Sequence, residues 1–153
     1  MIVLTLNLWR SIMNIKRIIY VAAVVNNPCQ LNEFIDDNMP NKYCHHVTLK
    51  FGGIDELPSF LGKEVAFIGD LRAYNDKAVA LIGNIADDEI SNYVGDDHVQ
   101  HITICTAADV KPVYSNCLLD EGYCEFIDEV TVLCRVGAFV VFEDDSTGWV
   151  FNN

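Results

Sequence analysis

Apolar and polar residues alternate in short runs along this chain, a pattern that predicts strands over most of its length. Residues 17–25 form a continuous β-branched and apolar run, which is typical of a buried strand. Similar runs at 45–51, 99–106 and 129–142 predict three more strands, the last with a kink or turn at Gly137. The chain is therefore expected to be rich in sheet.

Two further strands and one helix complete the expected elements. Residues 63–71 and 77–84 predict strands that the turn residues 73–76 join as a hairpin. Apolar residues recur at helical spacing after Pro28, so residues 28–38 predict an amphipathic helix. The other segments show no clear period: 54–62 and 85–94 predict a loop or a short helical turn, 107–128 a loop, 144–148 a turn and 149–151 a short strand.

These elements predict a single α+β domain, with antiparallel sheets and few helices, over residues 17–153. Residues 1–16 are expected to form a loosely held N-terminal extension, because the first clear strand begins only at residue 17. No apolar run reaches the roughly 18 residues needed to cross a bilayer, and the start lacks the pattern of a signal peptide. We therefore expect no membrane contact and a cytoplasmic location, with the six cysteines as reduced thiols.

The chain is strongly acidic, with 10 basic and 22 acidic residues and a net charge of −12. Proteins that hold long nucleic acids neutralise several phosphates with Lys and Arg, so no long nucleic acid is expected as a partner. A small nucleotide or a short oligonucleotide agrees better with this charge. Local positive charge around Lys50 and Lys111 stays open as an alternative within the acidic whole.

Two short segments of the chain share one pattern, a histidine and a threonine two residues apart. They are His46-Val47-Thr48 and His101-Ile102-Thr103, and each lies in a predicted strand. Residues i and i+2 of a strand share a face, so each segment presents an imidazole and a hydroxyl on one side and an aliphatic residue on the other. The duplication predicts a paired acid and base with two hydroxyls between them.

This set of side chains suits attack at a phosphodiester. One imidazole removes a proton from the attacking hydroxyl or water, and the other protonates the leaving oxygen. Thr48 and Thr103 can donate hydrogen bonds to the non-bridging phosphate oxygens. The scheme needs no metal and no cofactor, and the sequence leaves open which of His46 and His101 is the base.

Further residues are candidates for contacts with the substrate. Lys50 continues the face of the first motif and is expected to add positive charge near the phosphate. Cys105 continues the face of the second motif and is expected to form part of the cleft wall rather than a metal ligand. Four tyrosines could stack a nucleobase, with Tyr20 and Tyr114 preferred over Tyr43 and Tyr74. Two histidines outside the motifs predict surface positions: His45 and His98.

The motif pair resembles the signature of the 2H phosphoesterase superfamily, which includes LigT-like cyclic phosphodiesterases. The order of the expected elements agrees with that superfamily over roughly residues 17–142. Residues 101–106, taken with 111–116, also resemble the cyclic phosphodiesterase domain of fungal tRNA ligases. The resemblance implies a two-lobed, pseudo-symmetric fold in which each lobe supplies one His-x-Thr motif to a central cleft.

The resemblance also implies a metal-independent phosphodiesterase that acts on small nucleotides. Substrates of the superfamily are cyclic oligonucleotide signals, 2′,5′-oligoadenylates and 2′,3′-cyclic phosphates, and phage and viral members blunt immune signalling in the host cytoplasm. Three alternatives remain at this point. The chain could repair RNA ends as a 2′,3′-cyclic phosphodiesterase of the tRNA-ligase type, bind a nucleotide without turning it over, or be a structural domain with histidines in its core.

Overall fold

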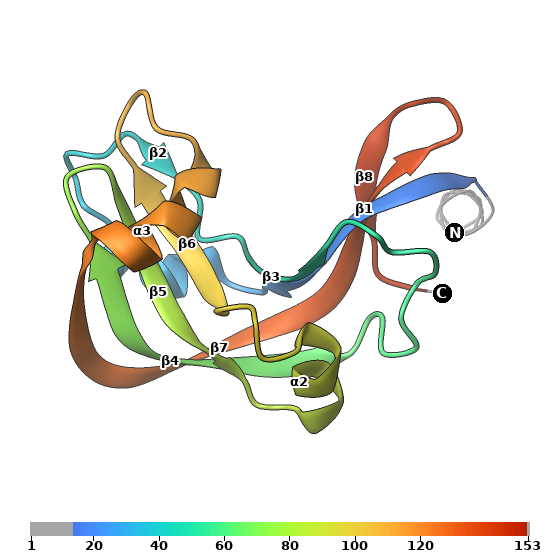
Figure 1. Cartoon of the computed structure of the whole chain (residues 1–153), viewed down its shortest axis with the longest axis horizontal. Helices are drawn as coiled ribbons and strands as arrows, with labels where there is room; N and C mark the ends of the chain where they lie inside the picture. The colour runs from blue at the N-terminus through green and yellow to red at the C-terminus, as the bar shows by residue number, and fades with distance from the viewer. Residues whose placement is uncertain (1–13, 153) are drawn as a thin grey trace.

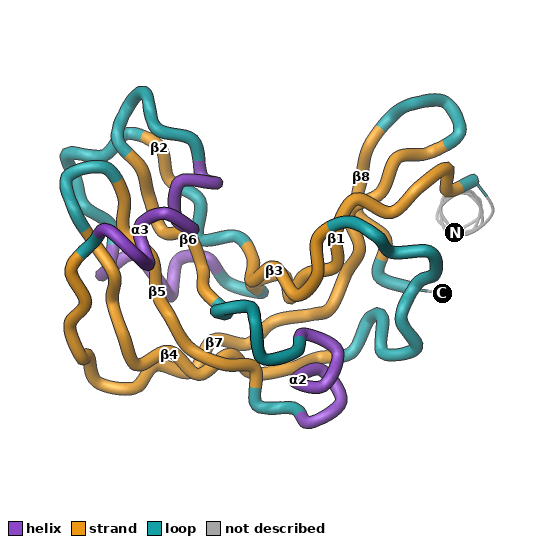
Figure 2. Tube along the Cα trace, viewed as in Figure 1, coloured by secondary structure: helices purple, strands orange, loops and turns teal. Residues whose placement is uncertain are grey.

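The computed structural model describes residues 14–152, which form a mixed α+β fold with mostly antiparallel sheet. Strands make up most of the trace, and the helical segments are short connections between them (Figure 2). In chain order the elements are β1 (Ile15–Val25), η1 (Pro28–Phe34), β2 (Asn41–Lys42), β3 (His46–Phe51), β4 (Glu64–Tyr74), β5 (Ala78–Ile85), α2 (Asp88–Val94), β6 (His101–Thr106), η2 (Pro112–Tyr114), α3 (Ser115–Glu121), β7 (Tyr123–Phe142) and β8 (Thr147–Val150).

The strands pair in a closed circuit. They follow the order β1-β3-β6-β5-β4-β7, and β7 pairs with β1 again. The 20-residue strand β7 makes this closure possible, because its first part pairs with β4 and its last part with both β1 and β8. Figure 1 shows the result as two arms above a base that β4 and β7 cross. We call them the β6 arm, with β2, β6 and α3, and the β8 arm, with β8 and the start of β1.

The core fills the inside of this circuit. Fully buried apolar side chains from several strands meet there, among them Phe67 of β4 and Leu81 of β5. The middle residues of the two motifs, Val47 and Ile102, belong to the same core and are fully buried. Burial of these aliphatic side chains fixes which face of β3 and β6 points inward, and so directs the motif histidines and threonines to the opposite face.

The strand predictions at 17–25, 45–51, 63–71, 77–84 and 99–106 are confirmed to within a few residues, and β1 begins slightly earlier, at Ile15. The N-terminal extension predicted at 1–16 falls, up to residue 13, outside the described residues. Among residues 14–152, no helix has the length and apolar character needed to cross a membrane.

Three local predictions are wrong: the helix at 28–38, the kink or turn at Gly137 and the loop at 107–128. The helix expected at 28–38 is a 3-10 helix that ends at Phe34, because Leu31 is its one buried residue and the backbone is extended again at Ile35. The expected kink or turn at Gly137 does not interrupt the strand, since β7 continues through this residue and the ring of Phe151 packs where a Cβ would be.

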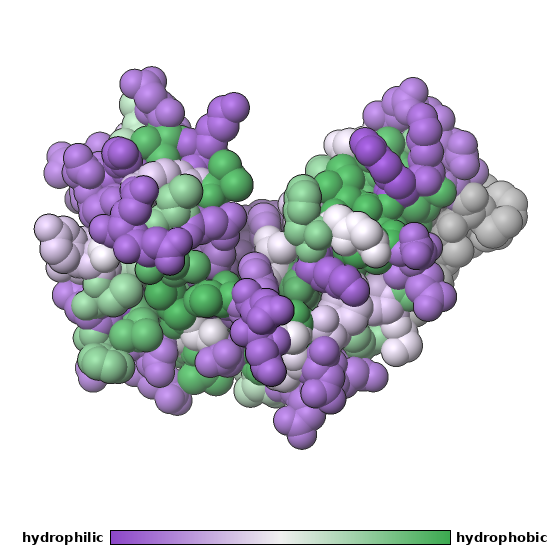
Figure 3. All heavy atoms as spheres, in the orientation of Figure 1, coloured by the Kyte–Doolittle hydropathy of each residue, from purple (hydrophilic) through white to green (hydrophobic). Residues whose placement is uncertain are grey.

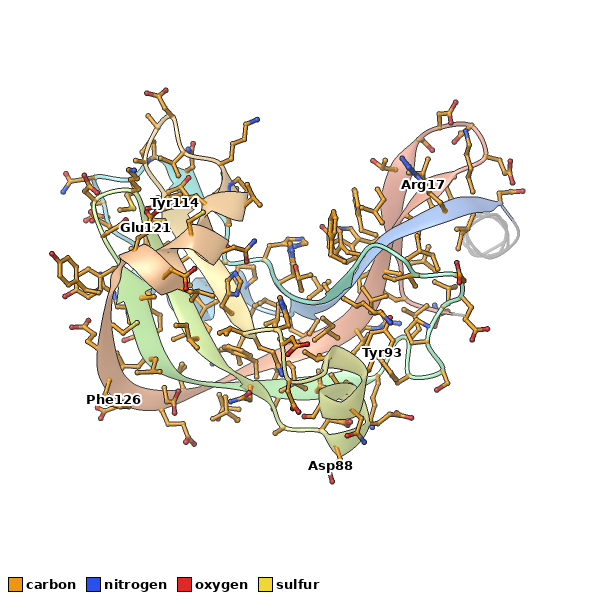
Figure 4. The ribbon with its side chains drawn as sticks, viewed as in Figure 1. Arg17, Asp88, Tyr93, Tyr114, Glu121 and Phe126 are labelled. Atoms are coloured by element: carbon orange, nitrogen blue, oxygen red, sulfur yellow. The ribbon has the colours of Figure 1, made fainter. Side chains whose placement is uncertain are left out.

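The segment 107–128, expected as a loop, contains η2, α3 and the start of β7. The first part of β7 carries no alternating pattern because residues on both of its faces are exposed or only half-buried. Phe126 is 87% exposed and lies on the outer side of the β6 arm (Figure 4). Backbone pairing with β4, rather than burial of apolar side chains, holds this part of the strand in place.

Candidate active site

The two motifs meet across neighbouring antiparallel strands. Val47 of β3 pairs directly with Ile102 of β6. Because the strands run in opposite directions, the histidine of each motif lies across from the threonine of the other. The aliphatic residues face the core, so the four remaining motif side chains share the other face: His46, Thr48, His101 and Thr103.

A pocket of about 600 Å³ opens over these four side chains. Residues of β1, β3, β6 and the η2–α3 segment line it, with three residues of the neighbouring loops, and a notch between the two arms is visible in Figure 3. All four histidines of the chain take part in the lining. The other lining residues are the two motif threonines, the aromatic residues Tyr20, Tyr43 and Phe51, and the η2–α3 residues Pro112, Val113, Ser115 and Asn116.

His46 lies among other rings on the β8 side of the pocket. Its ring stacks on Tyr20, with centroids 5.3 Å apart, and its Nδ1 lies 2.9 Å from Nδ1 of His45. Burial, together with the smaller effects of the neighbouring imidazoles of His45 and His101, lowers the pKa of His46 to about 4. His46 is therefore neutral near pH 7 and able to accept a proton.

The contact between the two Nδ1 atoms links the tautomers of His45 and His46. Only one of the two nitrogens can carry the shared hydrogen, since one must donate and the other accept. When Nδ1 of His46 donates to His45, Nε2 of His46 is bare and can act as a base. Burial also lowers the pKa of His45, which keeps its own ring neutral and able to accept.

His101 is held differently, by oxygen atoms. Its Nδ1 lies 2.9 Å from the carbonyl oxygen of Val99, and its Nε2 lies 3.0 Å from Oγ of Ser115. A carbonyl only accepts, so Nδ1 carries a hydrogen in every protonation state. Burial lowers the pKa of His101, the hydrogen bond to Val99 raises it, and the nearby His98 lowers it. Burial and hydrogen bonding thus oppose each other at this ring.

Lys50 does not reach the pocket, contrary to the prediction. Thr48 and Lys50 pair with consecutive residues of β1, so Leu49 is the extra residue of a β-bulge. The bulge reverses the alternation, and the ammonium of Lys50 lies over the ring of Tyr93, 5.0 Å from its centroid. Phe51, which is 74% exposed, lines the pocket in its place.

Cys105 does not form a cleft wall either, and the cause is the same. Thr103 and Cys105 pair with consecutive residues of β5, so Ile104 is the extra residue of a second bulge. Cys105 is fully buried, and its Sγ lies 3.6 Å from the sulfur of Met39. Its thiol therefore belongs to the core.

Tyr114 also lies outside the pocket lining, whereas Tyr20 is part of it. The hydroxyl of Tyr114 donates to Glu121 at 2.8 Å and accepts from the side-chain amide of Asn75 at 2.9 Å. Figure 4 shows Tyr114 and Glu121 together on the β6 arm. Of the two less favoured tyrosines, Tyr43 lines the pocket and Tyr74 does not.

Sequence reasoning missed four polar residues of the pocket: His45, His98, Ser115 and Asn116. His45 is exposed, as predicted, yet its ring faces His46. His98 is half-buried, and its Nε2 contacts the backbone oxygen of Thr48 at 2.8 Å. The closeness of His45 and His98 to the motifs in sequence was the available signal. No motif or periodic pattern in the sequence around Ser115 indicates its place in the pocket, because α3 brings it to the site from a distant segment.

The pocket is nearly free of formal charge. Of the residues between 14 and 152 that line it, none is Lys, Arg, Asp or Glu, so Lys111 and Lys50 add no local positive charge there. Among these lining residues, only an imidazole can carry a positive charge. Within the same described part of the chain, no three His, Cys, Asp or Glu side chains are placed to hold a metal ion.

Comparison of the sequence with models of known protein families and with curated proteins gave no match.

Proposed function

We propose that this protein is a phosphodiesterase of the 2H type that acts on a small nucleotide, with His46 as the base and His101 as the acid. One observation carries the proposal. The pairing of Val47 with Ile102 brings two imidazoles and two hydroxyls, from motifs far apart in sequence, to one face and one pocket. The two arms on either side of that pocket agree with the two-lobed architecture of this superfamily.

The roles follow from the surroundings of the two rings. Burial and the imidazoles of His45 and His101 hold the pKa of His46 near 4, so this ring accepts a proton. Burial is the larger cause at His101 and lowers its pKa, but the hydrogen bond from Nδ1 to Val99 opposes that effect and supports the charged form, which can donate from Nε2. Two titratable groups whose surroundings shift their pKa values to different extents are the usual arrangement of an acid and a base.

In the proposed reaction, the attacking oxygen gives its proton to His46 as it bonds to phosphorus. The bond from phosphorus to the leaving oxygen breaks, and that oxygen takes a proton from His101. Thr48 and Thr103 donate to the non-bridging oxygens, where negative charge builds up. Water as the attacking group opens a 2′,3′-cyclic phosphate, whereas a neighbouring ribose hydroxyl cleaves a chain and leaves a cyclic phosphate.

The lining of the pocket favours a nucleotide with little charge. A phosphodiester carries a single negative charge, which one imidazolium and two hydroxyls can balance in the absence of lining Lys and Arg residues among those described. Tyr43 and the exposed ring of Phe51 offer aromatic faces beside the histidines, and such faces bind nucleobases by stacking, whereas the ring of Tyr20 already stacks on His46 and Phe139.

A turnover assay in the presence of EDTA tests the proposal. The panel contains 2′,3′-cyclic mononucleotides, 2′,5′-oligoadenylate and cyclic dinucleotides, with His46→Ala and His101→Ala as the test variants. Two further variants, Thr48→Val and Thr103→Val, remove the hydroxyls of the motifs. Thr147→Val is their matched control, because Thr147 is exposed on β8. Turnover that both histidine variants lose supports the proposal. A folded protein that binds a panel member and releases it unchanged is instead a binding module, and one that neither binds nor cleaves any member contradicts the proposal.

A further inference from the structure

The hydroxyl of Ser115 lies at the centre of a buried group of polar atoms beside the second motif. Its Oγ is 3.0 Å from Nε2 of His101, 2.8 Å from Oγ1 of Thr103 and 2.9 Å from the carbonyl oxygen of Pro112. The residue is 2% exposed, so these protein atoms, rather than bulk water, must satisfy it. How one hydroxyl serves three partners depends on where the hydrogens are.

Counting hydrogens leaves two arrangements. Ser115 has one hydrogen and two lone pairs, and Pro112 offers only an acceptor. If Ser115 donates to Pro112, then Nε2 of His101 must donate to Ser115, and His101 carries hydrogens on both nitrogens because Nδ1 already donates to Val99. If Ser115 donates to Nε2 instead, His101 is neutral and the bond to Pro112 is given up.

Thr103 fits both arrangements. With no phosphate bound, its hydroxyl can donate to Ser115 whichever way the serine hydrogen points, because a lone pair of Oγ is free in each case; with a phosphate bound, this hydrogen turns to the non-bridging oxygen. In the charged arrangement every hydrogen in the group has an acceptor, and the bond from His101 to Ser115 is charge-assisted and therefore stronger. The group is thus complete when His101 holds its second proton, and it loses one weaker bond when His101 gives that proton up.

We infer that Ser115 is the positioning residue of His101, and that its hydroxyl turns with the protonation state of the ring. It donates to Nε2 of neutral His101, and it accepts from Nε2 of charged His101 while donating to Pro112. The kinetic part of this inference rests on the proposed function, whereas the hydrogen bonding does not. Nε2 of His101 faces Ser115 in both protonation states, so the ring keeps its orientation until the leaving oxygen of a substrate takes the place of Ser115 at Nε2.

The surroundings of His101 contain few other groups that titrate. His98 precedes it in the chain, with ring centroids 6.3 Å apart, and His46 faces it from β3. The pocket residues of η2 and α3 are uncharged, and the partner of His101 in β5 is the apolar Ile82. The remaining titratable residues of the pocket are His45, Tyr20 and Tyr43. No carboxylate among the described lining residues competes with Ser115 for the proton of His101.

Nitrogen-15 NMR of the imidazoles tests the hydrogen bonding without any substrate. In the wild-type chain at high pH we expect neutral His101 with its hydrogen on Nδ1, whereas free histidine prefers Nε2. In Ser115→Ala we expect His101 to titrate at lower pH than in wild type, because the charge-assisted partner is gone. Ser91→Ala is the matched control, since Ser91 is exposed on α2. A neutral Nε2 tautomer in wild type, or equal titration in Ser115→Ala and Ser91→Ala, overturns the inference.

Kinetics on a substrate from the panel provide the second measurement. We expect Ser115→Ala to lower kcat about three- to tenfold, roughly the net value of one hydrogen bond, with little change in KM. The basic limb of the pH profile should move to lower pH, and Ser115→Thr, which keeps the hydroxyl, should restore part of the rate. A higher kcat in Ser115→Ala would mean that the serine blocks His101, and would overturn the inference.

The two measurements separate the two proposals. An NMR shift in Ser115→Ala together with no turnover of any panel member supports the role of Ser115 and contradicts the phosphodiesterase. Turnover without the NMR shift supports the phosphodiesterase and contradicts the role of Ser115. The tautomer of wild-type His101 needs no variant, so it decides the hydrogen bonding even if Ser115→Ala fails to fold.

Discussion

The strands β3 and β6 carry the same motif in different surroundings. In each, the middle aliphatic residue is buried in the core, and a β-bulge follows directly after the threonine. Beyond that point they differ, because His46 contacts another imidazole through Nδ1, whereas His101 contacts a backbone carbonyl. The shared sequence therefore sets the geometry of each half of the site, and the neighbours of each ring set its pKa.

Removing either imidazole should have the largest effect and should expose the difference between them. We expect His46→Ala and His101→Ala each to lower kcat by about 10²- to 10⁴-fold, the usual contribution of a positioned acid or base. For the wild type, kcat/KM should fall below about pH 4, where His46 takes up a proton. It should also fall above the pKa of His101, which is lowered from the usual 6.5, so the maximum lies between these two values. His46→Ala should lose the acid limb and His101→Ala the basic limb. The opposite pattern in a pH series would reverse the assigned roles.

Stability should depend on pH through the same rings. The pKa of His46 is about 4 in the folded chain, against about 6.5 in an unfolded one. Between these values the unfolded chain binds a proton that the folded chain does not, so the free energy of unfolding falls as the pH falls. We expect His46 to account for a loss of about 2 kcal/mol between pH 7 and pH 5.

Urea denaturation at the two pH values measures this loss. His46→Gln should flatten the dependence, and it should do so more than His101→Gln, because the hydrogen bond to Val99 opposes the effect of burial at His101. If His46→Gln unfolds with the pH dependence of the wild type, the low pKa assigned to His46 is wrong.

The partner of His46 should matter less than His46 itself. We expect His45→Ala to lower kcat about tenfold, because Nδ1 of His46 then has no fixed acceptor and the bare Nε2 tautomer is no longer selected. Loss of the second imidazole also removes one cause of the low pKa of His46, so the acid limb should move to higher pH. A pH series of kcat/KM measures both effects. An acid limb that stays in place would show that His45 has no influence on His46.

The sequence was sufficient for the parts of the site that depend on strand periodicity. Alternation within each motif predicts the shared face of histidine and threonine, and the register of β3 with β6 agrees with it. Alternation failed one step further along, at Lys50 and Cys105, because a bulge inserts one residue and reverses every later side chain. Residue types alone do not mark where a bulge falls.

Other residues of the site come from distant segments, which local patterns do not connect. Ser115 reaches His101 only because η2 and α3 fold back over β6. Tyr114 is its neighbour in sequence, yet the 3-10 turn directs its hydroxyl to Glu121 and away from the pocket. Tyr114 and Ser115 are adjacent in a tight helical turn, yet one points away from the pocket and the other into it. No periodic pattern in the sequence predicts which of the two residues faces the pocket.

The bulge in β3 provides the smallest and most specific contrast, between two adjacent residues. Phe51 lines the pocket, so Phe51→Ala should raise KM several-fold by removing a stacking face, which is worth about 1 kcal/mol or more per base. Lys50→Ala should leave KM and kcat within about twofold, because its ammonium lies over Tyr93 and exposed charges of this kind contribute little. Steady-state kinetics at two salt concentrations distinguish the cases. If Lys50→Ala raises KM more than Phe51→Ala and the difference fades in salt, the lysine reaches the phosphate and the bulge does not control access to the pocket.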